Sequence, residues 1–330
     1  MNTNRTMLSI KVIFILFLIA LPLIVRDQYW IHIIDIIGIY SILSLGLNIL
    51  VGFTGQLSLG HAAFFGISAY TSAILAIRLH FPFLICILAA VVVSAFFGLI
   101  LSYPCLRLKG IYLAITTIGF GQIMYTVFVE WRGLTHGPMG LTGIPSPKIG
   151  NIVFDNSTYY YYIILLCFLL ALLVALRINN SHIGRSMKSI RDDEMAAETC
   201  GVDIARYKMI GFVISAAFAG MSGSLYAHYL NFISPDSFTF DFSTQMLIMI
   251  LIGGVGSIPG SVIGAIVVTF IPEILRDFKM YQMVIYGAIL VLILIFLPDG
   301  LSQIFRNIPS KLGLNKLLKN TNALAGKDNS

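Results

Sequence analysis

Charged residues are scarce in this sequence. Only 11% of its 330 residues are Asp, Glu, Lys or Arg, whereas 58% are hydrophobic and the mean hydropathy is +0.89. A soluble domain has about 25% charged and about 45–50% apolar residues. So little charge cannot cover a water-facing surface, which predicts that lipid surrounds most of the chain. The net charge of +6 does not indicate a nucleic-acid partner, because basic residues on cytoplasmic loops give the same value.

The chain also lacks the groups of residues that carry chemistry. Its four cysteines, Cys86, Cys105, Cys167 and Cys200, form no CxxC pair, which argues against a disulfide framework or a zinc site. It has no G-x-x-x-x-G-K-[ST] phosphate loop, no metal-ligand spacing and no nucleophile–base set. No His, Asp and Glu gather at one membrane depth, which disfavours a membrane-embedded enzyme. We therefore expect no cofactor, no metal and no enzymatic activity in this chain.

Apolar runs bounded by charges or turn residues follow one another along the chain. Most are long enough to cross, as a helix, a hydrocarbon layer about 30 Å thick. They predict an all-α integral membrane protein of about ten transmembrane helices, within a range of roughly eight to eleven because two runs are short or glycine-broken. An uncleaved first helix is favoured over a signal peptide, because no small-x-small cleavage site precedes Arg26. The runs cover residues 8–25, 31–51, 61–79, 81–103, 111–129, 158–176, 209–230, 243–253, 261–275 and 280–297.

Lys and Arg are unevenly distributed between alternate sides of these spans. With the N-terminus placed inside, 15 of the 21 basic residues fall on the inner side. The positive-inside rule then predicts that both termini and segment 177–208 are cytoplasmic, and that the turn-rich segment 130–157 is external. We expect residues 1–309 to form a single transmembrane domain and residues 310–330 to be a polar, disordered cytoplasmic tail.

Two glycine-rich clusters interrupt the apolar pattern. Broken helices of this kind often line transport pathways, whereas an ordinary turn between two hairpin helices is the alternative. Polar side chains within the clusters favour pathway lining, although a lone His61 at a helix start also suits capping or packing. The first cluster contains Gly52, Gly55, Gln56, Ser58, Gly60 and His61, and the second contains Gly253, Gly256, Ser257, Pro259 and Gly260.

Ionisable residues are nearly absent from the spans. His32 and Asp35 lie about one helical turn apart near the outer end of a span, where we expect a local hydrogen-bonded pair. Proton-driven carriers usually hold acidic residues in mid-membrane. Their scarcity here indicates that the energy for any transport comes from elsewhere.

The polar segment 177–208 predicts a short amphipathic helix outside the membrane. Good helix formers dominate residues 186–199, Gly201 is a natural stop, and Met187, Ile190 and Ala197 share an apolar face. Such a helix suits a groove on a partner protein. A solvated linker or a helix on lipid headgroups is the alternative, and the acidic residues disfavour lipid docking.

The run RDDEMAAETCGVDIARYK at residues 191–208 resembles the coupling loop of the branched-chain amino acid permeases of ABC importers, the LivM family. GFTGQLSLGHAAFFGISAY from Gly52, LTGIP from Leu141 and GGVGSIPGSVIGA from Gly253 fit the same family in the same order. The resemblance covers residues 46–298 and implies a type II ABC-importer-like permease fold in a bacterial inner membrane. It also implies four kinds of partner: a homologous second permease subunit, two ABC ATPase subunits, a substrate-binding protein and membrane lipid.

The resemblance further implies a site and a cargo. The common importer pattern is Glu-Ala-Ala, three residues, then glycine, and this chain departs from it because Met195 occupies the Glu position and Glu194 comes one residue early. The implied cargo is leucine, isoleucine or valine, with urea or short-chain amides as the nearest alternative and an ion-coupled carrier or channel as a different class. The implied ATPase-coupling residues are Arg185, Lys188, Arg191, Asp192, Asp193, Glu194, Ala196, Ala197, Glu198 and Gly201.

Overall fold

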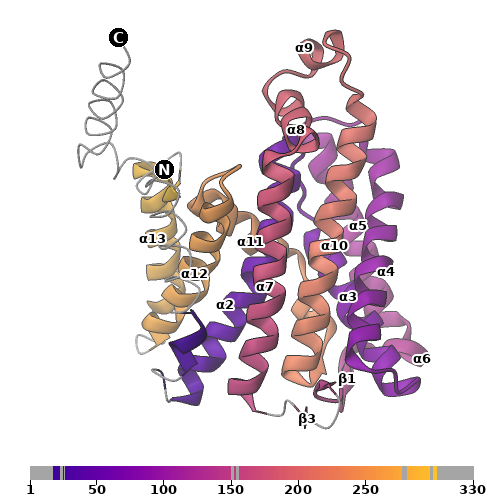
Figure 1. Ribbon diagram of the computed structural model, residues 1–330, viewed down its shortest axis with the longest axis vertical. Helices are drawn as coiled ribbons and strands as arrows, with labels where there is room; N and C mark the ends of the chain where they lie inside the picture. The colour runs from indigo at the N-terminus through magenta and orange to yellow at the C-terminus, as the bar shows by residue number, and fades with distance from the viewer. Residues whose placement is uncertain are drawn as a thin grey trace, which may run out of the picture.

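The computed structural model describes residues 18–22, 25, 27–149, 152–153, 156–276, 281–297 and 300–302, and it is a bundle of helices (Figure 1). The all-α expectation is confirmed. Two small two-stranded sheets pair β1 (Leu141–Thr142) with β4 (Phe232–Ile233) and β2 (Lys148–Ile149) with β3 (Ile152–Val153). The main helices are α2 (Gln28–Asn48), α3 (His61–Arg78), α4 (Phe83–Cys105), α5 (Ile111–Glu130), α7 (Ser157–Asn180), α8 (His182–Asp192), α9 (Glu194–Thr199), α10 (Ile204–Leu230), α11 (Phe240–Gly253), α12 (Ile258–Ile274) and α13 (Gln282–Phe296).

The longer apolar helices coincide with expected apolar runs, and five of the described helices are long and apolar enough to cross a membrane. These are α4, α5, α7, α10 and α2 together with its π-helical continuation η1 (Ile49–Phe53). α11 and α12 are apolar but shorter, at 14 and 17 residues. The structure does not confirm the count of ten, and the expected first span and the tail at 310–330 lie largely or wholly outside the described residues.

Helix α10 lies at the centre of the bundle and packs against α4, α3 and α2. Small residues allow this close approach: a Cβ added to Gly220 would meet the Val91 backbone at 2.7 Å, and one added to Gly98 would meet the Ala216 methyl at 2.6 Å. Between the same helices, Ser94 Oγ donates a 2.7 Å hydrogen bond to the Ala216 carbonyl. Such small-residue contacts are how helices associate in lipid, where burial of apolar surface gives no driving force.

The two ends of the bundle carry different elements (Figure 1). α8 and α9 lie at one end, and β1 and β3 lie at the other, beside the short helices α6 (Arg132–Thr135) and η2 (Gly137–Met139). Two contacts between distant segments each lie at a single end of the bundle. Lys109 forms an ion pair with Glu194 at the first end, and Arg78 donates a hydrogen bond to the Gly133 carbonyl at the second. Each contact joins segments that the expected topology places on the same side of the membrane.

Candidate functional site

The polar segment between α7 and α10 folds as two helices rather than the single helix expected over residues 186–199. α8 ends at Asp192, and the next residue, Asp193, is extended with φ of −160°. Its carboxylate accepts hydrogen bonds from the backbone N–H groups of Met195 (2.9 Å) and Ala196 (3.1 Å) and so begins α9. The reason for the break is that aspartate stabilises a helix start better than a helix interior.

The apolar face expected for this segment is confirmed. Met187 and Ile190 of α8 and Ala197 of α9 are each no more than 4% exposed. The expected stop at Gly201 is also confirmed, since this residue has φ of +82° and its N–H donates to the Glu198 carbonyl at 2.9 Å. The loop is therefore seated on the end of the bundle, with its polar side chains free to make specific contacts.

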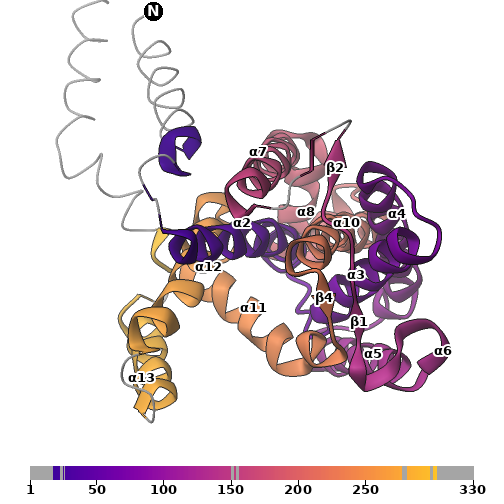
Figure 2. The same cartoon turned by 90° about the horizontal axis from the view of Figure 1, so that it is seen from below.

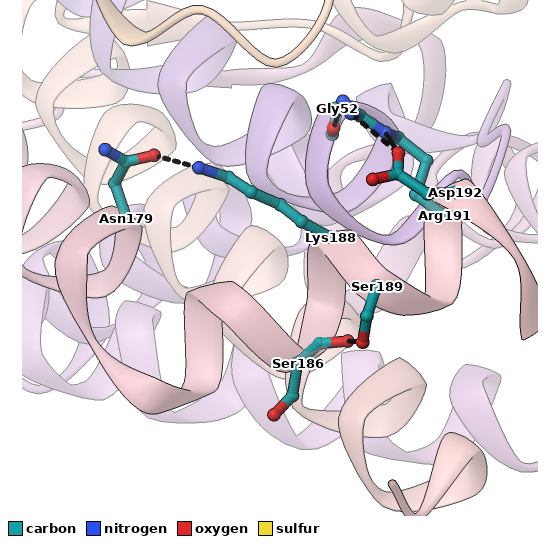
Figure 3. Close-up of polar contacts among 7 residues, drawn as sticks. All are labelled: Gly52, Asn179, Ser186, Lys188, Ser189, Arg191 and Asp192. Carbon is teal, nitrogen blue, oxygen red and sulfur yellow. Dashed lines mark hydrogen bonds and ion pairs between the residues drawn. The ribbon is translucent and has the colours of Figure 1, made fainter. Parts of the chain in front are cut away.

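Lys188 of α8 points toward Asn179 at the end of α7 (Figure 3). Its Nζ donates a 2.6 Å hydrogen bond to Asn179 Oδ1 and lies 4.7 Å from the centre of the Phe53 ring. Burial and the neighbouring Arg191 guanidinium lower the pKa of Lys188. These contacts hold α8 against the end of α7 and the π-helical turn η1.

Arg191 makes the contact that links α8 to the first glycine cluster (Figure 3). Its Nη1 donates a 2.7 Å hydrogen bond to the Gly52 carbonyl, and its Nε and Nη2 donate to Asp192 at 3.1 and 3.0 Å. Gly52 lies in η1, among the last carbonyls of the helix, which lack partners within the helix and carry its negative dipole end. The guanidinium therefore caps the helix end where the chain leaves helical conformation.

The two glycine clusters, about 200 residues apart in sequence, meet at this point. Asn48 joins them: its Oδ1 accepts from the Gly256 N–H at 2.8 Å, and its Nδ2 donates to the Ser257 carbonyl at 2.9 Å. A Cβ on Gly52 would overlap both Asn48 Oδ1 and the Gly256 backbone, so these backbones touch only because both residues are glycine. We call Asn48, Gly52, Gly55, Gly256 and Ser257 the glycine junction.

Arg191 also contacts both sides of the glycine junction. A Cβ on Gly55 would meet Arg191 Cγ at 3.2 Å, and a Cβ on Gly256 would meet Arg191 Nη1 at 2.8 Å. Gly55 and Gly256 have φ of +70° and +82°, a conformation that side chains disfavour. The Arg191 guanidinium is thus packed directly against the point where the two glycine clusters meet.

The first cluster continues as a non-helical segment, residues 55–60, inside the bundle. Gln56, Ser58 and His61 are each no more than 2% exposed. In the part of the chain that the structure describes, Ser58 Oγ and both His61 ring nitrogens are buried without a hydrogen-bond partner. Each such group costs about 1–3 kcal/mol, which natural proteins retain mainly where function uses it.

Backbone groups of this segment are satisfied by neighbouring side chains. The Leu59 N–H donates to Thr117 Oγ1 and the Ala62 N–H donates to Ser243 Oγ, each at 3.0 Å. A Cβ on Gly60 would overlap the Thr117 carbonyl, so Gly60 permits close approach to α5. This is the arrangement required of irregular backbone inside a membrane bundle, where protein must replace water as the hydrogen-bond partner.

The second cluster is a turn followed by a helix start. Gly254 and Gly256 have positive φ, and the Ser257 side chain accepts from the Gly260 N–H at 3.2 Å to begin α12, with Pro259 in its first turn. A Cβ on Gly253 would overlap Gly260, so both glycines allow α11 and α12 to touch. The first cluster is therefore an interrupted buried segment, and the second cluster is a tight turn.

The acidic residues of the loop have separate partners. Glu194 forms ion pairs with both Lys109, before α5, and Lys208, in α10, and the Lys208 side chain is 3% exposed. Burial opposes ionisation of Glu194, but hydrogen bonds from Lys109 and Lys208 outweigh it and hold its pKa below the ordinary value. The Glu198 side chain is exposed and forms no hydrogen bond or ion pair with the described residues, and Met195 is 77% exposed, so the outward side of α9 presents these two side chains.

The expected His32–Asp35 pair is not formed directly. His32 Nδ1 lies 2.8 Å from the Tyr229 hydroxyl, whereas both carboxylate oxygens of the buried Asp35 lack a hydrogen-bond partner among the described residues. A tyrosine on α10 therefore takes the place of Asp35 as the partner of His32. Sequence spacing alone does not reveal a partner from another helix.

Four residues of the site were not among the sequence candidates: Asn48, Lys109, Asn179 and Lys208. Asn48 had a usable signal, because an amide inside an apolar run just before a glycine cluster must find a buried partner. Lys109 and Lys208 had no such signal in the sequence, because their role depends on the packing of α5 and α10 beside α9. Within the described chain, no group of three or more His, Cys, Asp or Glu is arranged to hold a metal ion.

The long apolar helices, the irregular buried segment and the polar helix pair seated on it define a polytopic transport permease. A model of the family described as branched-chain amino acid transport system / permease component matches residues 30–294, and the chain belongs to this family. The family consists of transport permeases rather than enzymes.

Named relatives agree with this membership. The chain is 36% identical over 291 residues to the high-affinity branched-chain amino acid transport system permease protein LivM of Salmonella typhimurium, a match that covers 81% of this chain and 68% of the relative. LivM of Escherichia coli is 35% identical over the same shares of both chains. LivH of Escherichia coli, another permease protein, is 25% identical over 79% of this chain and 90% of its own length. No solved structure matches the chain.

Proposed function

We propose that this chain is a transmembrane permease subunit of an ATP-binding-cassette importer that moves leucine, isoleucine and valine across a bacterial inner membrane. Its partners are a homologous second permease, two ATPase subunits and a substrate-binding protein. The family supports the transport role, and the names of LivM and LivH support this cargo over urea or short amides. Residues 1–309 form one transmembrane domain, and the positive-inside rule supports cytoplasmic termini.

The contact between Arg191 and Gly52 is the observation that carries the coupling part of this proposal. α8 and α9 form the surface on which an ATPase docks, and the exposed Met195 and Glu198 face that partner. Arg185, Ala196 and Cys200 lie on the same exposed loop. When the ATPases close on ATP, they displace α8 and α9, and Arg191 passes the displacement to the glycine junction.

The buried irregular segment supplies the moving part of the pathway. Gln56, Ser58 and His61 lie near the junction of α2 and α3, with polar atoms that have no hydrogen-bond partner among the described residues. A second conformation, in which water or the substrate reaches these atoms, satisfies them. Alternation between two such states is the behaviour that transporters need, and irregular backbone lining a cavity is a common way to build it.

The test is uptake of labelled leucine into proteoliposomes that contain the complete importer, with ATP supplied on the cytoplasmic side. Uptake is expected to need ATP and to be abolished by deletion of residues 185–201. Because the deletion could also damage folding, Met195→Glu is the sharper variant: Met195 is 77% exposed and touches little of the bundle. This variant should insert normally and lose ATPase binding and uptake together.

ATP-independent uptake that follows an imposed ion gradient and persists in Met195→Glu would establish a carrier instead. Replacing labelled leucine with labelled urea in the same vesicles decides between the two cargo classes. Urea uptake without leucine uptake would contradict the assigned cargo while leaving the importer class intact.

A further inference from the structure

The outward faces of α4 and α7 are uniformly apolar, as expected for helices that contact lipid. In residues 84–103 of α4 and 159–176 of α7, no charged or amide side chain is exposed. On α4 these residues are Leu84, Ile85, Leu88, Val92, Phe96, Leu99, Ile100 and Tyr103, and on α7 they are Tyr159, Tyr162, Leu166, Leu170, Leu173, Val174 and Leu176.

The outward face of α5 has a different composition. In the middle of this 20-residue helix, Gly119, Gln122 and Thr126 are exposed in positions that follow one another along one face. The Thr126 hydroxyl donates a 2.9 Å hydrogen bond to the Gln122 backbone carbonyl. In contrast, no described residue forms a hydrogen bond with the Gln122 side-chain amide. An amide at mid-membrane depth facing hydrocarbon would lose its hydrogen bonds to water without replacement, so this face does not suit lipid.

Gly119 gives a second and independent indication. A Cβ added at this position would meet nothing within 4 Å, so packing inside this chain does not require a glycine there. In contrast, the glycines of α10 and of the glycine junction are all in close contact with neighbouring backbone or side chains. An exposed glycine in the middle of an apolar helix suits the close approach of a helix from another subunit.

The polar face extends from α5 onto the start of α11. A cleft of about 160 Å³ lies between them, lined by Gln122, Tyr125, Thr239, Phe240 and Asp241. The Tyr125 hydroxyl is 3.4 Å from Asp236 Oδ1 at the same end. Figure 2 shows α5 and α11 on the side of the bundle opposite α7, so this face is separate from the apolar surface of α7.

We propose that this face, Gly119, Gln122 and Thr126 of α5 with Asp241 of α11, is the surface on which the homologous second permease docks, with Gln122 turned to the aqueous space between the two subunits. This inference rests on the proposed function, which requires a permease partner. The chain resembles both LivM and LivH, so a related partner can present an equivalent face across a pseudo-twofold axis. Water between the subunits satisfies the Gln122 amide.

Site-specific photo-crosslinking in the assembled importer tests the location. A benzophenone side chain is placed at Gly119 or Thr126, and at Leu88 or Val92 of α4 as matched controls. The complex is purified through a tagged ATPase subunit, so recovery of this chain reports assembly before illumination. Crosslinks to the second permease are expected from the α5 positions at least tenfold more than from the α4 positions.

Crosslinks to the second permease from α4 but not from α5 would overturn the proposed surface while leaving the importer assignment intact. Crosslinks from α5 to another copy of this chain would also overturn it, since the occupant would then be wrong. Failure of this chain to co-purify with the ATPase contradicts the proposed function itself, before any crosslink is measured.

A second measurement tests the aqueous environment of Gln122. Gln122→Cys and Val92→Cys are made in a Cys200→Ser background, because Cys200 is the exposed native cysteine among the described residues. A charged, membrane-impermeant thiol reagent is expected to label Gln122→Cys at least tenfold faster than Val92→Cys in the reconstituted complex. Equal, slow labelling of both positions would overturn the placement of Gln122 beside water.

Discussion

Arg191 and Gly52, 139 positions apart, are joined by a 2.7 Å hydrogen bond from the guanidinium to the glycine carbonyl. The bond connects a helix outside the main bundle to the point where α2 and η1 end. Because Arg191 also packs on Gly55 and Gly256, a movement of α8 cannot occur without a change at the glycine junction. We regard this contact as the mechanical link between the proposed ATPase surface and the buried irregular segment.

Arg191→Met should therefore uncouple transport. The substitution removes a charge-assisted hydrogen bond, worth about 1.5–3 kcal/mol, while keeping part of the apolar stem. We expect ATP hydrolysis by the assembled importer to continue while leucine uptake per ATP falls by about tenfold or more. Asp192→Asn is the matched control, because Asp192 pairs with Arg191 at the surface and does not reach Gly52. Unchanged uptake per ATP in Arg191→Met would refute the link.

Glu194→Gln should destabilise the protein in a pH-dependent way. The change breaks ion pairs to Lys109 and to the buried Lys208, and we expect a loss of about 2 kcal/mol near neutral pH. The folded pKa of Glu194 is lowered by its lysine partners, so its contribution is fully present above the unfolded pKa. It is lost as the pH falls through the folded pKa.

Thermal unfolding in detergent across a pH series measures this effect. The difference in Tm between wild type and Glu194→Gln should be largest near neutrality and should shrink in the acid range below the ordinary carboxyl pKa. Glu198→Gln serves as the control, since Glu198 has no ion pair in the described chain, and its effect should stay within about 0.5 kcal/mol. A Tm difference that grows as the pH falls would contradict the ion-pair explanation.

Gly52→Ala should be strongly disruptive although it adds only one methyl group. The new Cβ would overlap Asn48 Oδ1 and the Gly256 backbone, which cannot both move without separating the glycine junction. We expect a destabilisation of about 1–3 kcal/mol, in the range of overpacked cores, together with loss of uptake. Gly133→Ala, where a Cβ meets nothing within 4 Å, should change stability little. Equal stabilities of the two variants, measured by thermal unfolding, would show that the junction is not tightly packed.

Much of the architecture could be predicted from the sequence, because it depends on local patterns. Apolar runs gave the helices, and the basic residues divided the loops between two ends in agreement with the contacts of Lys109 and Arg78. Gly201 marked the end of the polar helix because the left-handed backbone conformation found there favours glycine. The same reasoning missed the break at Asp193, since good helix formers on both sides concealed a better capping position.

The relations within the site could not be read in this way. The sequence marked both glycine clusters but not their contact, because that contact depends on how α11 and α12 pack against α2. Arg191 was a candidate for binding the ATPase, whereas the structure turns its guanidinium inward to Gly52. Glu194 likewise forms internal ion pairs, which leaves Glu198 and Met195 as the outward side chains of α9.

Gly201→Pro should uncouple transport without preventing membrane insertion. Gly201 has φ of +82°, which proline cannot adopt, and its N–H donates to the Glu198 carbonyl. The end of α9 would therefore be distorted on the side where we propose that the ATPase docks. Gly201→Asn is the matched control because asparagine tolerates this backbone conformation and keeps the N–H. ATP-driven uptake should be lost in the proline variant and largely retained in the asparagine variant, and equal uptake would count against a coupling role for α9.

Co-purification of the tagged protein from mild detergent extracts of its native membrane, with partners identified by mass spectrometry, tests the central claim most directly. An importer subunit should bring down a second polytopic permease of the same family and an ATPase that carries the phosphate-loop motif this chain lacks. The Met195→Glu variant should lose the ATPase and keep the permease. Recovery of the chain alone, repeated after mild cross-linking, would contradict the importer assignment and indicate a channel or carrier.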